Sequence, residues 1–79
     1  MFLTEYEAKV ALAVRDQSGT SEQIAQRAGV VGRTTRKNLT KLIGLGMVER
    51  VMTWLPTYKW IGTTEFANEA RAVLRAIDG

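Results

Sequence analysis

Four cationic side chains stand close together near the middle of the sequence, at spacings that could support binding to an anionic polymer. They are Arg33, Arg36, Lys37 and Lys41. In a helix this spacing keeps them on the side away from the apolar residues of the segment. Arginine and lysine can donate hydrogen bonds to phosphate oxygens and to guanine O6 and N7 in the major groove. The chemistry that these residues indicate is contact with nucleic acid.

The distribution of charge along the chain supports the same interpretation. Residues 20–46 hold five basic and one acidic side chain, a surplus of +4, whereas residues 1–19 carry −1 and residues 47–79 are neutral. The net charge of +3 therefore arises in the segment that contains the four cations. The ordinary alternative is a solvated basic helix face, which such charge clusters usually form.

Four residues of this segment are expected to contact base edges. The N-terminal positions of a recognition helix lie deepest in the major groove, and asparagine can pair bidentately with adenine. The residues expected to contact bases are Arg33, Thr34, Lys37 and Asn38.

Six further residues are expected to contact phosphates. Arg36 and Lys41 belong to the basic segment. Thr20 and Ser21 lie at the start of a predicted helix, whose backbone amides favour anions. Arg50 and Lys59 lie on predicted strands, where solubility is the alternative role.

Catalysis, metal binding and cofactor binding are not expected. The chain has no cysteine and no histidine, so it lacks thiolate ligands, a cysteine nucleophile and the commonest general base. The carboxylate pairs Glu5/Glu7 and Glu65/Glu69 stand near predicted helix starts, where acidic residues complement the helix dipole. The N-terminus carries neither a basic leader nor a long apolar run. We expect a cytoplasmic, nucleoid-associated protein that is not an enzyme and has no membrane segment.

The elements that would position these residues begin with two helices. Residues 1–79 are long enough for one small domain. Two capping boxes, starting at Thr4 and Thr20, predict helices that run to about residue 17 and to Ala28, and Gly29 is expected to form a left-handed cap. Val30 is expected to fill the core between the second helix and the next. The expected apolar stripes of these two helices are Tyr6, Val10, Ala13 and Val14, followed by Ile24, Ala25 and Ala28.

The basic segment itself is expected to form a helix from about Gly32 to Leu45. Its predicted core arc consists of Thr35, Leu39, Leu42 and Ile43, and Gly46 is expected to end it.

Residues 47–54 and 58–61 predict a β-hairpin with its turn centred on Pro56. In that register Val51 faces Ile61, Met52 faces Trp60 and Trp54 faces Tyr58. Both faces of the hairpin would then be apolar, and only one can cover the core. The tip at Trp54 and Leu55 has three possible contacts: its own domain, a partner chain, or DNA as an apolar wedge. The first two are preferred, because little positive charge flanks the tip.

A last helix should start at Thr63 or Thr64 and present Phe66, Ala70, Val73, Leu74 and Ile77 on one stripe. This stripe either closes the core or serves a dimer interface. The residues expected to contact a partner or a second copy, from the hairpin and this helix, are Met52, Trp54, Leu55, Tyr58, Trp60, Phe66, Val73, Leu74 and Ile77.

Several runs of the sequence resemble small bacterial and archaeal regulators of the MarR/ArsR-like superfamily. They are residues 21–30, Arg33-Thr34, residues 39–42 and, most specifically, Leu45-Gly46-Met47-Val48-Glu49-Arg50. The resemblance implies a mostly α, α+β winged helix-turn-helix with a three-helix core, a two-stranded β-hairpin wing and a C-terminal helix. It departs at Val31, where such regulators often have a capping serine or threonine, at Thr35, where an aliphatic residue is usual, and at the uncharged wing tip.

The resemblance implies a sequence-specific regulator of transcription that binds double-stranded DNA, with a repressor as the working expectation. We expect a homodimer, because one recognition helix reads few base pairs and paired half-sites increase specificity. No small-molecule effector is expected, since no residues remain for a domain to bind one. The alternative is a winged-helix protein-interaction module, or an architectural or excision-type phage accessory factor, that uses the aromatic wing.

Overall fold

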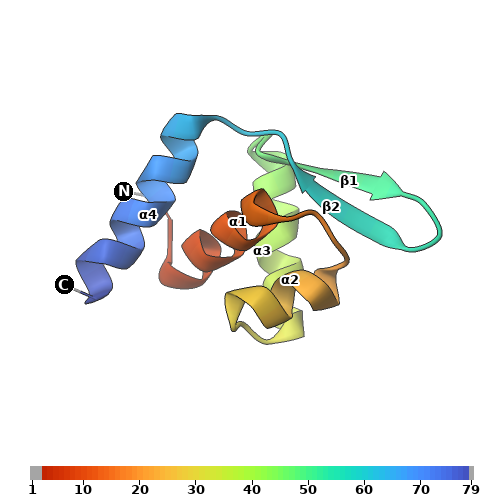
Figure 1. Ribbon diagram of the computed structural model, residues 1–79, viewed down its shortest axis with the longest axis horizontal. Helices are drawn as coiled ribbons and strands as arrows, with labels where there is room; N and C mark the ends of the chain where they lie inside the picture. Colours follow the sequence, from red (N-terminus) through yellow and green to blue (C-terminus); the bar gives the residue numbers. More distant parts are fainter. Residues whose placement is uncertain (1–2, 79) are drawn as a thin grey trace.

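The computed structural model describes residues 3–78 and has the expected mostly α, α+β architecture. Three helices pack into a core, a hairpin extends from one side of it, and a fourth helix lies on the opposite side (Figure 1). The elements are α1 (Glu5–Asp16), α2 (Ser21–Ala28), α3 (Gly32–Gly44), β1 (Val48–Met52), β2 (Pro56–Trp60) and α4 (Thr64–Asp78).

Threonine side chains begin three of the helices. Both predicted capping boxes are present: the Thr4 hydroxyl accepts from the Glu7 amide at 3.2 Å, and the Thr20 hydroxyl accepts from the Gln23 amide at 3.2 Å. Thr63 caps α4, because its hydroxyl accepts from the backbone amide of Phe66 at 3.1 Å. Local sequence therefore sets these helix starts.

Glycines end α2 and α3 as predicted. Gly29 has φ 69° and Gly46 has φ 78°, the left-handed conformation that residues with a Cβ adopt only at a cost. After α3 the amide of Met47 donates to the carbonyl of Leu42 at 3.0 Å, which completes a Schellman turn. The chain consequently passes directly from the turn after α3 into β1.

The turn between α2 and α3 is held by buried groups. Val30 is buried, as predicted, and its carbonyl accepts from the hydroxyl of Thr35 at 3.3 Å. Thr35 is fully buried, so this hydrogen bond satisfies its hydroxyl within the core. Val31 stands at the N-cap of α3 without a side-chain hydrogen bond, as the sequence predicted.

The core lies where α1 meets the other helices. Its largest fully buried apolar side chains are Val10, Val14, Ile24, Leu39, Leu42 and Val48. Two core predictions are wrong: Tyr6 is 52% exposed, and Ile43 lies at the solvent-exposed edge of α3. Because α1 is packed between α3 and α4, its small residues Ala8 and Ala11 are fully buried along with Val10 and Val14, and Leu3 also joins the core.

The predicted register of the hairpin is also wrong. Val48 pairs with Trp60 and Met52 pairs with Pro56, so the turn is centred on Trp54 and not on Pro56. Pro56 lacks an N–H group and is tolerated as the first residue of β2. The Thr53 hydroxyl donates to the Leu55 carbonyl at 2.9 Å and helps to close the turn.

One face of the wing packs on the body of the protein. Tyr58 and Trp60 lie against the core, and the ring of Trp60 is 6.0 Å from that of Phe66. The partner contact expected of Phe66 and Val73 on α4 is wrong, because both are buried. Tyr58, Trp60 and Leu74 pack against the core but are only partly buried, so the partner contact expected of them stays a prediction.

A backbone bridge attaches the wing to the loop before α2. The Tyr58 amide donates to the Gly19 carbonyl at 2.8 Å, and the Gly19 amide donates to the Tyr58 carbonyl at 3.2 Å. The position of the wing relative to the first turn of α2 is fixed by this pair.

Candidate nucleic-acid interface

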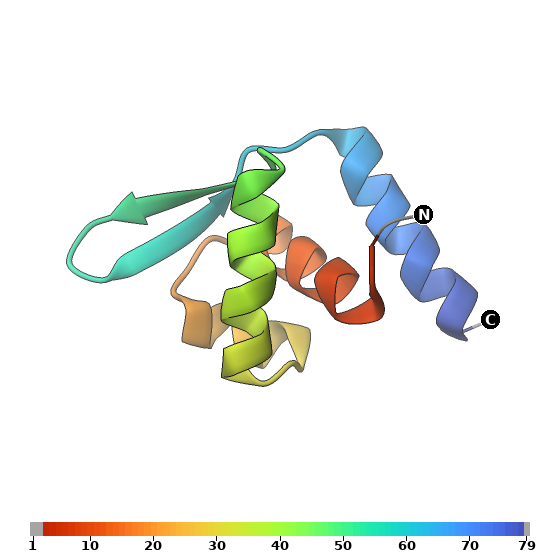
Figure 2. The ribbon, with the colours of Figure 1, turned by 180° about the vertical axis from the view of Figure 1, so that it is seen from behind.

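The solvent-facing side of α3 carries Arg33, Arg36 and Lys37, all exposed. Figure 2 shows α3 in front of the other helices, open along its length. Within residues 3–78, no hydrogen bond or ion pair engages the side chains of these three residues. Three unpaired cations within five positions form a surface that an anion can approach without displacing an internal partner.

Two neighbouring residues complete this face of α3. Thr34 is half-buried beside Arg33, so only part of its side chain is available. Thr40 is exposed, and its hydroxyl donates to the Arg36 carbonyl at 3.0 Å. Thr40 was not among the residues expected to contact DNA, although the helical period places it between Arg33 and Arg36 on this face.

Asn38 does not belong to the exposed face, and its expected role at a base edge is corrected. Only 8% of the residue is exposed, because Asn38 lies on the core side of α3 with Leu39 and Leu42. Its Nδ2 atom is buried and has no hydrogen-bond partner among the described groups. The sequence could not reveal this position, since an asparagine at the edge of a core arc is ordinarily solvated.

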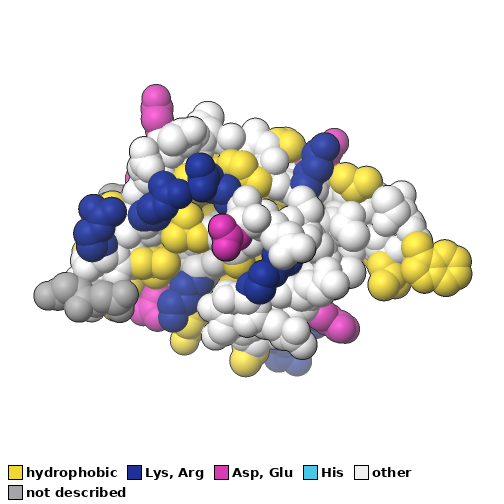
Figure 3. Space-filling model, viewed as in Figure 1, with side chains coloured by type: hydrophobic (Ala, Val, Ile, Leu, Met, Phe, Trp, Pro, Cys, Tyr) yellow, Lys and Arg dark blue, Asp and Glu magenta, His cyan; other side chains and the backbone are white. Residues whose placement is uncertain are grey.

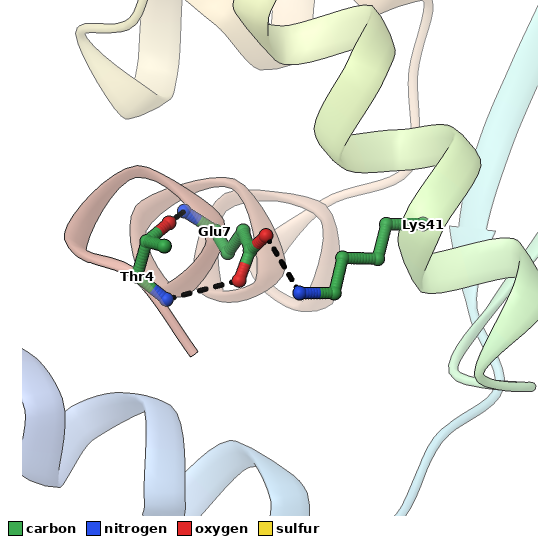
Figure 4. A network of polar contacts seen from close by, with 3 residues as sticks. All are labelled: Thr4, Glu7 and Lys41. Carbon is green, nitrogen blue, oxygen red and sulfur yellow. Dashed lines mark hydrogen bonds and ion pairs between the residues drawn. The ribbon is translucent and has the colours of Figure 1, made fainter. Parts of the chain in front are cut away.

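Lys41 differs from the other cations of α3 because it is paired. Its Nζ atom lies 2.9 Å from Oε2 of Glu7, while Oε1 of Glu7 accepts from the Thr4 amide at 2.9 Å (Figure 4). Burial raises the pKa of Glu7, but the hydrogen bond from the Thr4 amide and the charge of Lys41 outweigh it, so the pKa is lowered. Lys41 is thus drawn toward α1 and is less available to an external phosphate.

A groove separates α3 from the wing. Its volume is about 300 Å³. The residues that line it are Thr20, Ser21, Glu22, Arg36, Leu55, Pro56 and Tyr58. The structure therefore brings three expected phosphate contacts together in one hollow: Thr20, Ser21 and Arg36.

The first turn of α2 contributes backbone donors to this groove. The Thr20 hydroxyl is occupied by the Gln23 amide, whereas the amides of Ser21 and Glu22 have no acceptor within the described part of the chain. Such amides and the helix dipole favour an anion. The carboxylate of Glu22 at the same place opposes this attraction.

The two basic residues of the wing differ in their surroundings. Arg50 is exposed and makes no hydrogen bond or ion pair with any described residue. Lys59 faces Glu49 across the strands, with 3.7 Å between their charged atoms. Arg50 is accordingly the more available of the two for a phosphate.

The tip of the wing is apolar and open to solvent. Trp54 is 95% exposed, Met52 66% and Leu55 54%. This apolar cluster stands out at the end of the wing in Figure 3. The expectation that the tip packs on its own domain is wrong for Trp54. Ile77 on α4 is 52% exposed, and with Met52, Trp54 and Leu55 it makes up the exposed part of the expected partner-contact set.

No group of three or more histidine, cysteine, aspartate or glutamate residues within 3–78 is arranged to hold a metal ion. Among the described helices, none combines the length and the apolar character needed to cross a membrane.

Comparison with known proteins identifies the fold. No protein-family model matches the sequence, and no curated protein matches it. The crystal structure of a MarR family transcriptional regulator from Silicibacter pomeroyi DSS-3 is similar to this chain, with a TM-score of 0.67 and 14% sequence identity. The similarity covers 96% of this chain and 55% of that one, so the chain spans about half the length of the regulator. The chain has the winged helix-turn-helix fold.

Proposed function

We propose that this winged helix-turn-helix chain is a regulator of transcription that binds double-stranded DNA through α3. The observation that carries the proposal is the exposed side of α3, where Arg33, Arg36 and Lys37 have no partner within the described chain. Unpaired cations on one helix face can release the counterions of DNA without first breaking an internal ion pair. The similarity in fold to a MarR family transcriptional regulator supports the same function.

The contacts are divided between bases and phosphates. In the proposed complex α3 enters the major groove, where Arg33, Thr34 and Lys37 face base edges. Arg36 and the free amides of Ser21 and Glu22 hold a phosphate in the groove beside the wing. Arg50 is the wing residue that reaches a further phosphate, and Lys59 and Lys41 contribute less because each faces a carboxylate.

The active form is proposed to be a homodimer that represses from a site with two-fold symmetry. One α3 covers only a few base pairs, and two copies on related half-sites give the specificity that a regulator needs. A repressor of this kind works in the cytoplasm, at the nucleoid.

Selection of bound duplexes from a random pool tests the function, followed by affinity measurements at several salt concentrations. Arg33→Ala and Lys37→Ala should each weaken binding to the selected site by about 1–3 kcal/mol and relax the preference at one base pair. Arg75→Ala is the matched control, because it removes an exposed cation from α4, on the other side of the core. Failure to select any sequence, together with equal binding by all three variants, would refute the proposal.

A second candidate function is a winged-helix module that binds protein, favoured by the exposed apolar wing tip. An architectural or excision-type accessory factor would combine both activities. Salt dependence separates the candidates, because phosphate contacts make the affinity for DNA fall steeply as salt rises. A shallow dependence, or no measurable binding to duplex DNA, would favour the protein-binding module.

A further inference from the structure

The wing ends in an apolar cluster that the proposed contacts of α3 do not use. This wing-tip cluster consists of Met52, Trp54 and Leu55, which are 66%, 95% and 54% exposed. Soluble proteins rarely leave a tryptophan uncovered in this way, because its ring is a large apolar surface. The exposure of Trp54 indicates that the ring is covered by another molecule when the protein functions.

The cluster is joined to the surface proposed to hold phosphate. Leu55 and Pro56 form one wall of the groove whose other wall is Arg36 and the first turn of α2. The Gly19–Tyr58 backbone bridge holds the wing in this position. A molecule in the groove therefore touches cationic and amide donors on one side and the apolar tip on the other.

The donors in the groove identify the occupant. Arg36 and the amides of Ser21 and Glu22 have no acceptor within the described chain, so they suit an anionic backbone. An apolar protein surface would leave these donors unsatisfied at the contact, which costs free energy. Duplex DNA supplies phosphates for the groove and stacked bases for the tip.

The length of the wing fits this arrangement. Each strand has five residues, and a strand of that length extends about 17 Å. One turn of the duplex is about 34 Å, so half a turn separates the major groove under α3 from the next minor groove. A wing that begins at the end of α3 can reach that minor groove.

We propose that Trp54, supported by Leu55, inserts as an apolar wedge between base pairs in the minor groove beside the site of α3, and kinks the duplex. The proposal rests on the proposed function. The phosphate backbone between the two grooves lies in the hollow lined by Arg36. Pyrimidine–purine steps unstack most easily and are the expected points of insertion.

Fluorescence of Trp54 tests the insertion directly. The chain contains two tryptophans, and Trp60 packs beside Phe66, so the variant Trp60→Phe leaves Trp54 as the only tryptophan. Stacking on bases should quench its emission when the selected duplex, or sonicated genomic DNA, is added. Heparin is the control probe, because it is a polyanion without bases. Equal quenching by heparin, or no change at saturating duplex, overturns the wedge.

Bending of the duplex provides the second measurement. Energy transfer between dyes at the two duplex ends should report a kink with the wild type and with Tyr6→Ala, an exposed aromatic control on α1. Trp54→Ala should remove the kink and weaken binding roughly tenfold, while the steep salt dependence remains. Undiminished bending by Trp54→Ala overturns the wedge.

The outcomes separate the wedge from the proposed function. Salt-dependent binding without quenching or bending overturns the wedge and leaves DNA binding intact. Absence of duplex binding by the wild type overturns both. A shift of Trp54 emission that follows protein concentration without DNA assigns the tip to a contact between copies and also overturns the wedge.

Discussion

Lys41 Nζ lies 2.9 Å from Glu7 Oε2, so the first turn of α1 neutralises one cation of α3. The same carboxylate accepts from the Thr4 amide and completes the cap of α1. A single side chain thereby links the start of the fold to the charge of the proposed DNA surface. Both its effect on stability and its effect on binding can be measured.

The Glu7 carboxylate should make stability depend on pH in the acid range. Its pKa is lowered in the fold, so its contribution is present above the ordinary value of 4.5 and is lost as pH falls through the lowered value. Glu7→Gln keeps an acceptor for the cap but removes the charge, and should destabilise by up to about 1 kcal/mol at neutral pH. Thermal melting of both proteins across acid pH should show the difference disappear. Glu5→Gln, which alters an exposed pair with Lys9, is the control. If the difference in melting temperature between the wild type and Glu7→Gln stayed constant across acid pH, the lowered pKa of Glu7 would be contradicted.

Removal of the Glu7 charge should strengthen DNA binding, although it destabilises the fold. Without the carboxylate Lys41 is free to approach a phosphate, so Glu7→Gln should bind duplex DNA more tightly at low salt. Arg36→Ala should reduce the slope of log affinity against log salt by about 0.9, whereas Lys41→Ala should reduce it less. Titration at several salt concentrations measures all three variants. Equal slopes for Arg36→Ala and Lys41→Ala would show that Glu7 does not restrain Lys41 in the complex.

The left-handed turn after α2 should tolerate only glycine without loss. Nothing lies within 4 Å of a Cβ added at Gly29, so Gly29→Ala tests the backbone conformation alone, with φ 69°. We expect a loss of about 1–2 kcal/mol in the free energy of unfolding. Gly44→Ala is matched, because its Cβ also meets open space but its backbone is helical; it should stabilise by about 0.5–1 kcal/mol. Denaturant titration measures the free energy of unfolding of both variants. Similar effects at both positions would contradict the requirement for glycine at the left-handed position of Gly29.

Asn38 should behave as a structural residue with an unsatisfied amide. Its Nδ2 atom is buried without a partner, and such a group costs about 1–3 kcal/mol. Asn38→Leu should therefore raise the melting temperature and leave sequence preference unchanged. A selected site that loses its preference at one base pair in this variant would restore Asn38 as a base contact.

Much of the fold follows from local sequence signals. Thr4 and Thr20 start helices because each stands three residues before a reciprocal partner, and Gly29 and Gly46 end helices because they accept positive φ. These signals act within one turn of chain, so they can be read without knowing the tertiary structure.

The expectations fail where tertiary packing, and not local sequence, decides the structure. Tyr6 fits the helical period of an apolar stripe, yet α1 is packed between two helices and buries alanines in its place. Pro56 suggests a turn, yet it starts β2, because the turn formed at Thr53–Leu55 gives Tyr58 the position that pairs with Gly19. The pairing of Lys41 with Glu7 joins residues 34 positions apart, and no local pattern predicts it.

The backbone bridge between Gly19 and Tyr58 also protects the wing from misassembly. An unpaired strand edge is a template for pairing with another chain. Gly19 covers the outer edge of β2 at Tyr58, so the edge of the hairpin open to another strand is that of β1. Charged Glu49 and Arg50 stand on β1 and are exposed, and charges on an edge strand discourage such pairing. The protein can thus present an apolar wing tip without offering a ready edge for aggregation.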